Sequence, residues 1–127
     1  MTKNFVSRAA VFAAGLLVSA SAFASSGGNL QQAGTDLEDK ASLQRGAQLY
    51  MNNCAGCHSL KYLRYAGSGE GLGLAEDAVQ QDLNLGGGKI GDHVISPMTA
   101  EMGVAAFGKA PPDLSVIARV RGPDWIY

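Results

Sequence analysis

The sequence predicts one small, mostly α-helical domain built of helices and loops, and three observations support this. The chain has 127 residues, which allows a single such domain. Apolar residues recur at helical spacing in several short stretches, and glycine- and proline-rich breaks separate these stretches. Seventeen glycines favour a small core, so a large apolar cofactor would help the domain to fold. The net charge of −1 gives no sign of a nucleic-acid-binding surface.

The first 24 residues have the pattern of a secretory signal peptide. Lys3 and Arg8 form a positive start, residues 9–20 are apolar except for one serine, and residues 22–24 read Ala-Phe-Ala. The apolar run is too short for a typical membrane span. We therefore expect cleavage after Ala24 and an exported protein. An uncleaved N-terminal anchor is the alternative. No second hydrophobic run follows.

Residues 25–34 are rich in Ser, Gly, Asn and Gln and are expected to form a flexible leader, with residues 35–127 forming the domain. The first helix is expected to start at one of two caps. Thr35, with Glu38 three residues later, fits a capping box, and Asp39 fits equally well.

One face of this first helix is clear from the spacing of its apolar residues. Leu43, Ala47, Tyr50 and Cys54 lie at i, i+4, i+7 and i+11, so the helix leads to the first cysteine. Gly46 lies beside this face. Because glycine costs a helix interior about 1 kcal/mol relative to alanine, it indicates either close packing against another backbone or simple tolerance.

The motif Cys54-Ala55-Gly56-Cys57-His58 ends this helix and contains both cysteines of the chain. Two cysteines three apart, followed at once by histidine, form the c-type haem attachment pattern. Each thiol can bond to one vinyl group of the porphyrin, and the histidine can bind the iron as proximal ligand. The sequence therefore predicts one covalent haem c, attached at Cys54 and Cys57, with His58 on the iron.

Three other functions could use residues of the same motif. Cys54 and Cys57 could form a disulfide. A zinc site needs about four ligands, and the motif offers only three, two of them adjacent. A thioredoxin-like redox pair would expect a βαβ context with the first cysteine at a helix start, whereas here a helical pattern precedes it.

The residues after the motif predict the surroundings of the haem. Tyr62 and Tyr65, with two leucines, suit either a wall of the pocket or an ordinary core.

Residues 67–73 contain four glycines and superficially match a phosphate-binding loop. No strand precedes them and no Gly-Lys-Ser/Thr follows, so we expect a flexible loop.

Three more helices are expected in the second half of the chain. Residues 75–85 carry helical spacing, with acidic residues in the first turn and three glycines after the end. Residues 97–107 are expected to form a helix starting near Pro97 or Thr99, after a loop or short extended stretch at 89–96 that contains His93. Residues 116–121 are expected to form the last helix, capped by Asp113 or Ser115 and broken by Gly122-Pro123.

Several blocks together resemble the cytochrome c1 family of proteobacteria. They are residues 45–48, 54–65, 89–92 and 107–121. The haem motif alone is common to all c-type cytochromes, whereas Ser59-Leu60-Lys61-Tyr62 and Ala110-Pro111-Pro112-Asp113-Leu114-Ser115 in this order are far more specific. The likeness covers about residues 36–127.

The resemblance implies a c-type cytochrome fold, with helices and loops wrapped around one covalent haem. It implies the haem subunit of ubiquinol–cytochrome c reductase, an electron carrier rather than an enzyme in its own right. Its partners would be the Rieske iron–sulfur protein, cytochrome b and a soluble cytochrome c, on the periplasmic side of the bacterial inner membrane. By position, Pro111 would lie beside the proximal histidine, Arg121 would approach a haem propionate, and Trp125 would be an aromatic neighbour.

Two family features have no counterpart up to Tyr127, namely a methionine as sixth iron ligand and a C-terminal membrane anchor. The resemblance therefore implies an N-terminal fragment with a fold that is incomplete at its C-terminus. Met98 and Met102, one helical turn apart, are expected to pack rather than bind iron. The alternatives are a self-contained small cytochrome that uses Met98 or Met102, and a periplasmic thiol–disulfide oxidoreductase.

A last expectation concerns the proximal histidine. A ligating histidine usually donates its second ring N–H to a fixed acceptor. Residues 111–112 lack backbone N–H groups but keep their carbonyls, so we expect the Pro111 carbonyl to bind Nδ1 of His58.

Overall fold

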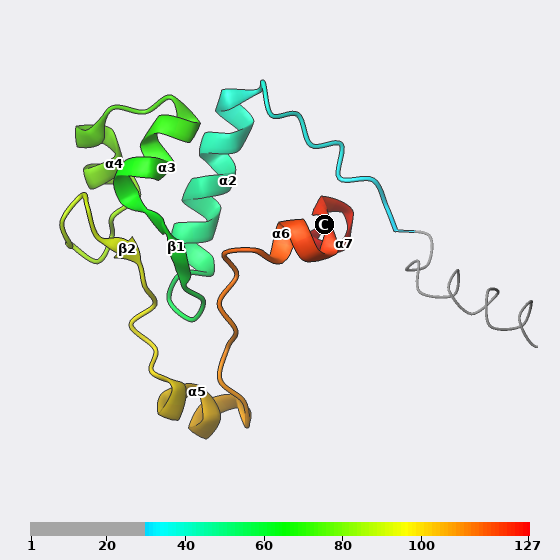
Figure 1. Ribbon diagram of the computed structural model, residues 1–127, viewed down its shortest axis with the longest axis vertical. Coiled ribbons are helices and arrows are strands. Elements are labelled where there is room, and N and C mark those ends of the chain that lie inside the picture. Colours follow the sequence, from blue (N-terminus) through cyan, green and yellow to red (C-terminus); the bar gives the residue numbers. More distant parts are fainter. Residues whose placement is uncertain (1–29) are drawn as a thin grey trace, which may run out of the picture. The chain divides into compact units, whose positions relative to one another are not determined.

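The computed structural model describes residues 30–127, and the compact unit with the cysteine motif runs from Ala33 to Tyr127 (Figure 1). Six helices and two short strands follow one another in this unit, so the mostly α prediction is confirmed. They are α2 (Lys40–Asn53), β1 (Leu60–Arg64), α3 (Tyr65–Leu72), α4 (Glu76–Asp82), β2 (His93–Val94), α5 (Ala100–Phe107), α6 (Ile117–Arg121) and α7 (Pro123–Ile126). The expected signal peptide lies outside the described residues.

Helix α2 begins after Asp39, whose carboxylate accepts a hydrogen bond from the Ser42 backbone N–H at 2.9 Å. The second of the two expected caps is therefore the real one, and Thr35 lies five residues before the helix. The inward face carries Ala47 and Tyr50, as the spacing predicts. A Cβ added at Gly46 would meet nothing within 4 Å, which favours tolerance over close packing at that position.

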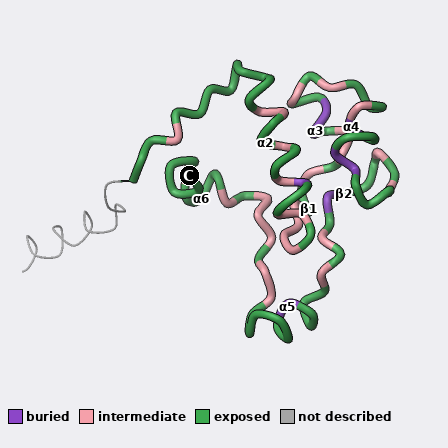
Figure 2. Tube along the Cα trace, turned by 180° about the vertical axis from the view of Figure 1, so that it is seen from behind, coloured by how far each residue is buried: buried purple, intermediate pink, exposed green. Residues whose placement is uncertain are grey.

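The core of the described unit is small. Four apolar side chains are buried, and they come from α2, α4, the residue after α4, and β2: Met51, Val79, Leu83 and Val94. Figure 2 shows these buried stretches close to one another, with half-buried neighbours around them. Val79 and Leu83 lie one helical turn apart on the face expected for this helix.

Strand β1 follows the cysteine motif and pairs antiparallel with β2, an element that the sequence analysis expected only as a short extended stretch. Leu60 pairs with Val94 and Arg64 with His93, with an irregularity between them. Two further backbone bonds continue the pairing, from Tyr65 N–H to the Asp92 carbonyl at 3.1 Å and from Ala66 N–H to the Ile90 carbonyl at 2.9 Å. The strand was missed because its partner lies about thirty residues later in the chain.

The expectation of a flexible loop at residues 67–73 is wrong, because most of this stretch belongs to α3. The helix is held by α2. Lys40 Nζ donates to the Gly71 carbonyl at 3.1 Å, and Gln44 Nε2 donates to the Leu72 carbonyl at 3.0 Å. These bonds satisfy carbonyls that a helix end leaves free.

Glycine also allows α3 to pack closely. A Cβ at Gly69 would lie 2.7 Å from Val79 Cγ2, so the absence of a side chain lets α3 approach α4. Gly73 then ends α3 with a positive φ of 68°.

Helices α4 and α5 lie within their predicted ranges. Glu76 and Asp77 occupy the first turn of α4. Thr99 caps α5 by accepting a bond from the Met102 backbone N–H at 3.2 Å. None of the six described helices has the length and apolar character needed to cross a membrane.

The expected cap of the helix at 116–121 is wrong. Helix α6 follows Val116, and no side chain caps it. Asp113 and Ser115 instead bind the backbone of β1. The last residues, expected only as a break, form the short helix α7, with Pro123 in its first turn where a proline fits.

Candidate functional site

The cysteine motif forms a tight turn directly after α2. The N–H groups of Cys57 and His58 both donate to the Cys54 carbonyl, at 3.0 and 2.9 Å. This turn places the two cysteines and the histidine within one short, folded stretch. Both thiols are free and half-buried, so the disulfide alternative is not what the structure contains.

A hydrogen bond fixes the imidazole ring of His58. Its Nδ1 lies 2.7 Å from the Pro112 carbonyl oxygen. Because a carbonyl can only accept, Nδ1 carries the hydrogen and Nε2 keeps a lone pair that can bind a metal. The expected acceptor segment is therefore right, but the carbonyl is that of Pro112 rather than Pro111.

The backbone of His58 is held by α2. The Tyr50 hydroxyl donates to the His58 carbonyl at 2.7 Å. Burial raises the pKa of Tyr50 to about 12, and the nearby charges of Cys54 and Asp113 act in the same direction. The phenol therefore stays protonated at neutral pH and remains a donor. The sequence spacing predicts that Tyr50 lies on the inner face of the helix but contains no signal for this bond.

The proline segment is positioned by close packing against α5. A Cβ at Gly103, which is buried in α5, would lie 2.5 Å from Pro111 Cδ and 3.1 Å from Ala110 Cα. Only glycine lets the helix and the segment approach this closely. On the other side, the Leu114 N–H donates to the Ser59 carbonyl at 2.9 Å, one residue after the histidine.

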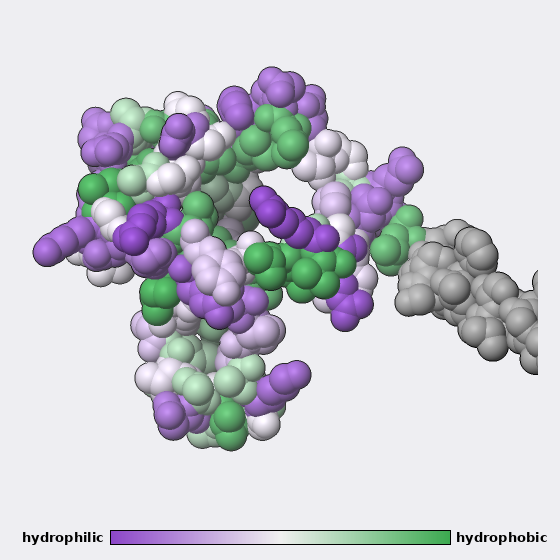
Figure 3. Space-filling model, viewed as in Figure 1, coloured by the Kyte–Doolittle hydropathy of each residue, from purple (hydrophilic) through white to green (hydrophobic). Residues whose placement is uncertain are grey.

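An apolar cavity of about 320 Å³ adjoins the histidine. Its lining combines the end of the motif with the end of α5 and the proline segment: Cys57, His58, Phe107, Lys109, Ala110, Pro111 and Pro112. Phe107 is 63% exposed and Met102 is 55% exposed, so α5 also presents apolar side chains to solvent. Figure 3 shows green and pale green atoms among hydrophilic ones at its lower end. Pro111 thus lies beside His58, as the resemblance implies.

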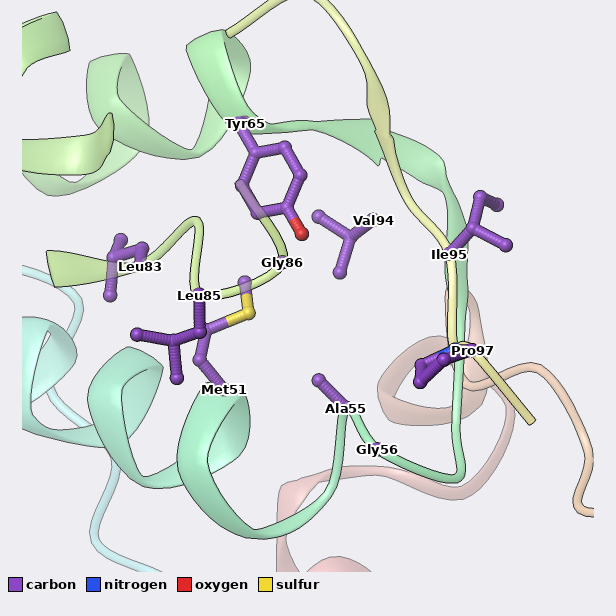
Figure 4. Close-up of a pocket in the computed structure, with 10 residues that line it drawn as sticks. All are labelled: Met51, Ala55, Gly56, Tyr65, Leu83, Leu85, Gly86, Val94, Ile95 and Pro97. Atoms are coloured by element: carbon purple, nitrogen blue, oxygen red, sulfur yellow. The ribbon is translucent and has the colours of Figure 1, made fainter. Parts of the chain in front are cut away.

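A second cavity of about 250 Å³ adjoins the motif at Ala55 and Gly56 (Figure 4). Met51, Ala55, Tyr65 and Val94 point into a common hollow there. Burial raises the pKa of Tyr65, and the Asp92 carboxylate adds to this, so its hydroxyl also stays protonated. Tyr65 therefore lines a cavity near the motif and also packs against the core, so both of the roles that its sequence position allows apply to it.

Two serines that the sequence analysis did not single out tie this side of the turn to the segment before α5. The Ser96 backbone N–H donates to Ser59 Oγ, and the Ser96 hydroxyl donates to the Gly56 carbonyl, both at 2.8 Å. The only sequence signal for them was the position of Ser59 directly after the histidine.

Other expected site residues lie elsewhere. Tyr62 is 70% exposed, and the Lys61 ammonium lies 5.2 Å from the centre of its ring. Tyr62 lines a separate cavity with Ser115 and Arg119 and neither of the two cavities at the motif. Arg121 stacks over the Trp125 ring at 5.0 Å, and neither lines the two cavities at the motif. Met98 and Met102 line neither cavity.

The residues at the motif fit a covalently attached haem. The set consists of two free thiols in one turn, a histidine with one nitrogen free and the other fixed, and adjoining apolar walls. Among residues 30–127, no three His, Cys, Asp or Glu side chains gather as a metal site, so the zinc alternative finds no further ligands there.

Comparison with known families decides which kind of haem protein this is. The model of the cytochrome C1 family matches residues 32–127. The chain belongs to the cytochrome c1 family. The cofactor of this family is one covalently bound haem c.

Curated relatives agree with this family. Cytochrome c1 of Allochromatium vinosum is 45% identical over 94% of this chain and 50% of that protein. The ammonia monooxygenase gamma subunit of Nitrosomonas europaea is 42% identical over 77% of this chain and 42% of its own length. Cytochrome c1 of Rhodospirillum rubrum is 33% identical over 70% of this chain and 39% of that protein. The chain therefore spans about half the length of the curated relatives it matches.

Proposed function

We propose that Cys54 and Cys57 hold the haem c through thioether bonds and that His58 binds its iron through Nε2. The observation that carries this is the 2.7 Å bond between His58 Nδ1 and the Pro112 carbonyl. It sets the tautomer that leaves Nε2 free, and a fixed acceptor increases the basicity of a ligating imidazole. The half-buried, free thiols of the same turn support the attachment.

The neighbouring residues have supporting roles. Pro111 and Phe107 would pack against the face of the ring and keep water from the proximal side, since both line the cavity beside His58. Arg121 would bind a propionate, a role that rests on the resemblance because its guanidinium stacks on Trp125 here. When bound, the haem supplies a reversible one-electron couple at its iron.

The protein would act as an electron carrier within ubiquinol–cytochrome c reductase. It would take one electron from the Rieske iron–sulfur protein and pass one to a soluble cytochrome c, beside cytochrome b. The chain would be exported by residues 1–24 and act on the periplasmic side of the inner membrane. Family membership supports this function.

Covalent attachment is tested by expression with the c-type maturation machinery and mass measurement of the denatured protein. We expect the mass of one haem on a chain that begins at Ser25. Cys54→Ala with Cys57→Ala should abolish most of the covalent product, and His58→Ala should change the optical spectrum of the iron. Asn52→Ala, an exposed position in α2 just before the motif, is the matched control and should leave the yield unchanged. Full yield of covalent haem from the double cysteine variant would refute the assignment.

A further inference from the structure

We propose that Asp113 is a positioning residue that fixes the Pro112 carbonyl against His58, with Ser115 as its helper. This inference rests on the proposed function, because it concerns how strongly the proximal histidine is held. Asp113 immediately follows Pro112 in the chain, so any shift of Asp113 shifts the carbonyl that accepts from Nδ1.

The side chains of Asp113 and Ser115 bind one edge of β1. Asp113 Oδ2 accepts from the Lys61 backbone N–H at 2.8 Å, and Ser115 Oγ accepts from the Tyr62 N–H at 3.1 Å. Asp113 and Ser115 flank Leu114, whose backbone N–H donates to the Ser59 carbonyl at 2.9 Å. We call these three bonds the edge latch. They connect the proline segment to the stretch that directly follows His58.

The carboxylate of Asp113 also holds its own segment in shape. Its second oxygen, Oδ1, accepts from the Ser115 backbone N–H at 3.0 Å. One side chain thus accepts two backbone N–H groups, one from each of the two segments. An amide of the same shape has only one acceptor oxygen, so it cannot accept both bonds.

The charged form of Asp113 is the one that these bonds favour. Partial burial pushes the pKa of Asp113 up, but the hydroxyl and N–H of Ser115 and the N–H of Lys61 outweigh it, so the pKa lies below the usual value. The carboxylate is therefore ionised at neutral pH, and bonds to an ionised acceptor are stronger than neutral ones.

The edge latch would affect the reduction potential of the iron through His58. The hydrogen bond to Nδ1 influences how strongly the imidazole donates electron density to the iron. This donation is one of the factors that set the reduction potential of a haem. A loosened Pro112 carbonyl makes His58 a weaker donor and favours the reduced iron. Weakening the edge latch should therefore raise the reduction potential and expose the His58 ring N–H to exchange with solvent.

The experiment compares the haem-loaded, full-length protein with Asp113→Asn and Ser115→Ala. Asp36→Asn is the matched control, since Asp36 also accepts a backbone N–H, from Glu38 at 2.9 Å, but has no bond to the proline segment. Two properties are measured, namely hydrogen exchange of the Lys61, Tyr62 and His58 ring N–H groups by NMR, and the reduction potential. Ser115→Ala removes a latch bond without changing charge, so it separates positioning from simple loss of a negative charge.

We expect Asp113→Asn to speed exchange at Lys61 and at the His58 ring about tenfold, the effect of losing one hydrogen bond to a charged group. Ser115→Ala should speed exchange at Tyr62 about fivefold. Both variants should raise the potential, while Asp36→Asn should leave exchange at these three groups unchanged.

Unchanged His58 ring exchange in both variants would overturn the proposal, even if Asp113→Asn shifts the potential through its charge. If Asp113→Asn does not fold, an unshifted potential and ring exchange in Ser115→Ala would overturn it equally. A wild-type protein without covalent haem would instead contradict the proposed function, and exchange at Lys61 and Tyr62 would still test the latch.

Discussion

Replacement of Gly103 by alanine tests the contact that brings α5 against the proline segment. The new Cβ would lie 2.5 Å from Pro111 Cδ and 3.1 Å from Ala110 Cα. Neither neighbour is the end of a flexible side chain, so α5 or the segment must move. Overpacking of this kind costs about 1–3 kcal/mol. The higher helix propensity of alanine offsets about 1 kcal/mol of this cost, so we expect a net decrease of about 0–2 kcal/mol in the free energy of unfolding.

Gly46→Ala is the matched control, because it makes the same chemical change inside a helix where the new Cβ meets nothing within 4 Å. At this position only the helix propensity changes, so we expect the free energy of unfolding to rise by about 0.5–1 kcal/mol. Urea unfolding of the two haem-loaded variants, followed by far-UV circular dichroism, measures both. The Gly103 variant should be about 1–3 kcal/mol less stable than the Gly46 variant. Equal stability of the two would refute the close-packing argument.

Three further changes test other parts of the fold. Asp39→Ala removes the cap of α2 and should lower the free energy of unfolding by about 1 kcal/mol in urea melts; no loss would mean that the bond to Ser42 is not formed in solution. Leu83 is only 1% exposed, so Leu83→Ala should lower the free energy of unfolding by about 2–5 kcal/mol. Leu49 is 64% exposed, so Leu49→Ala should lower it by about 0.5 kcal/mol or less, and similar losses for the two would contradict the assigned core. The lowered pKa of Asp113 predicts stabilisation that is present above its ordinary value of 3.8 and disappears as pH falls through the lower folded value. The stability difference between wild type and Asp113→Asn should therefore shrink in acid melts below that pH, and a constant difference would show that ionisation of this carboxyl plays no part.

The amino-acid sequence by itself determined the features that depend on neighbours within one or two helical turns. The inner face of α2 follows from apolar residues that recur every three or four positions. The acidic first turn of α4 and the Thr99 cap of α5 follow from residues within four positions of one another. The cysteine motif is also local, because attachment of one cofactor edge requires two thiols and a histidine in a single turn. The family could be identified from blocks of contiguous residues for the same reason.

The tertiary structure decided what depends on partners far along the chain. The glycine-rich stretch at 67–73 looks like a loop by itself and becomes helical because Lys40 and Gln44 of α2 bind its last carbonyls and because Gly69 lets it approach α4. Strand β1 exists because β2 supplies its pairing partner.

The same distinction applies to the site. A proline acceptor for His58 was expected, but the choice between two adjacent carbonyls depends on where the segment is held. The backbone of α5 packs closely against Pro111 at Gly103, and Asp113 binds the backbone of β1. Held in this way, the segment presents the Pro112 carbonyl to Nδ1 of His58. Asp113 has the residue type of a helix cap and would cap α6 if only local bonds were available. The N–H of Lys61, 52 positions away, binds it instead, and only the folded chain brings these groups together.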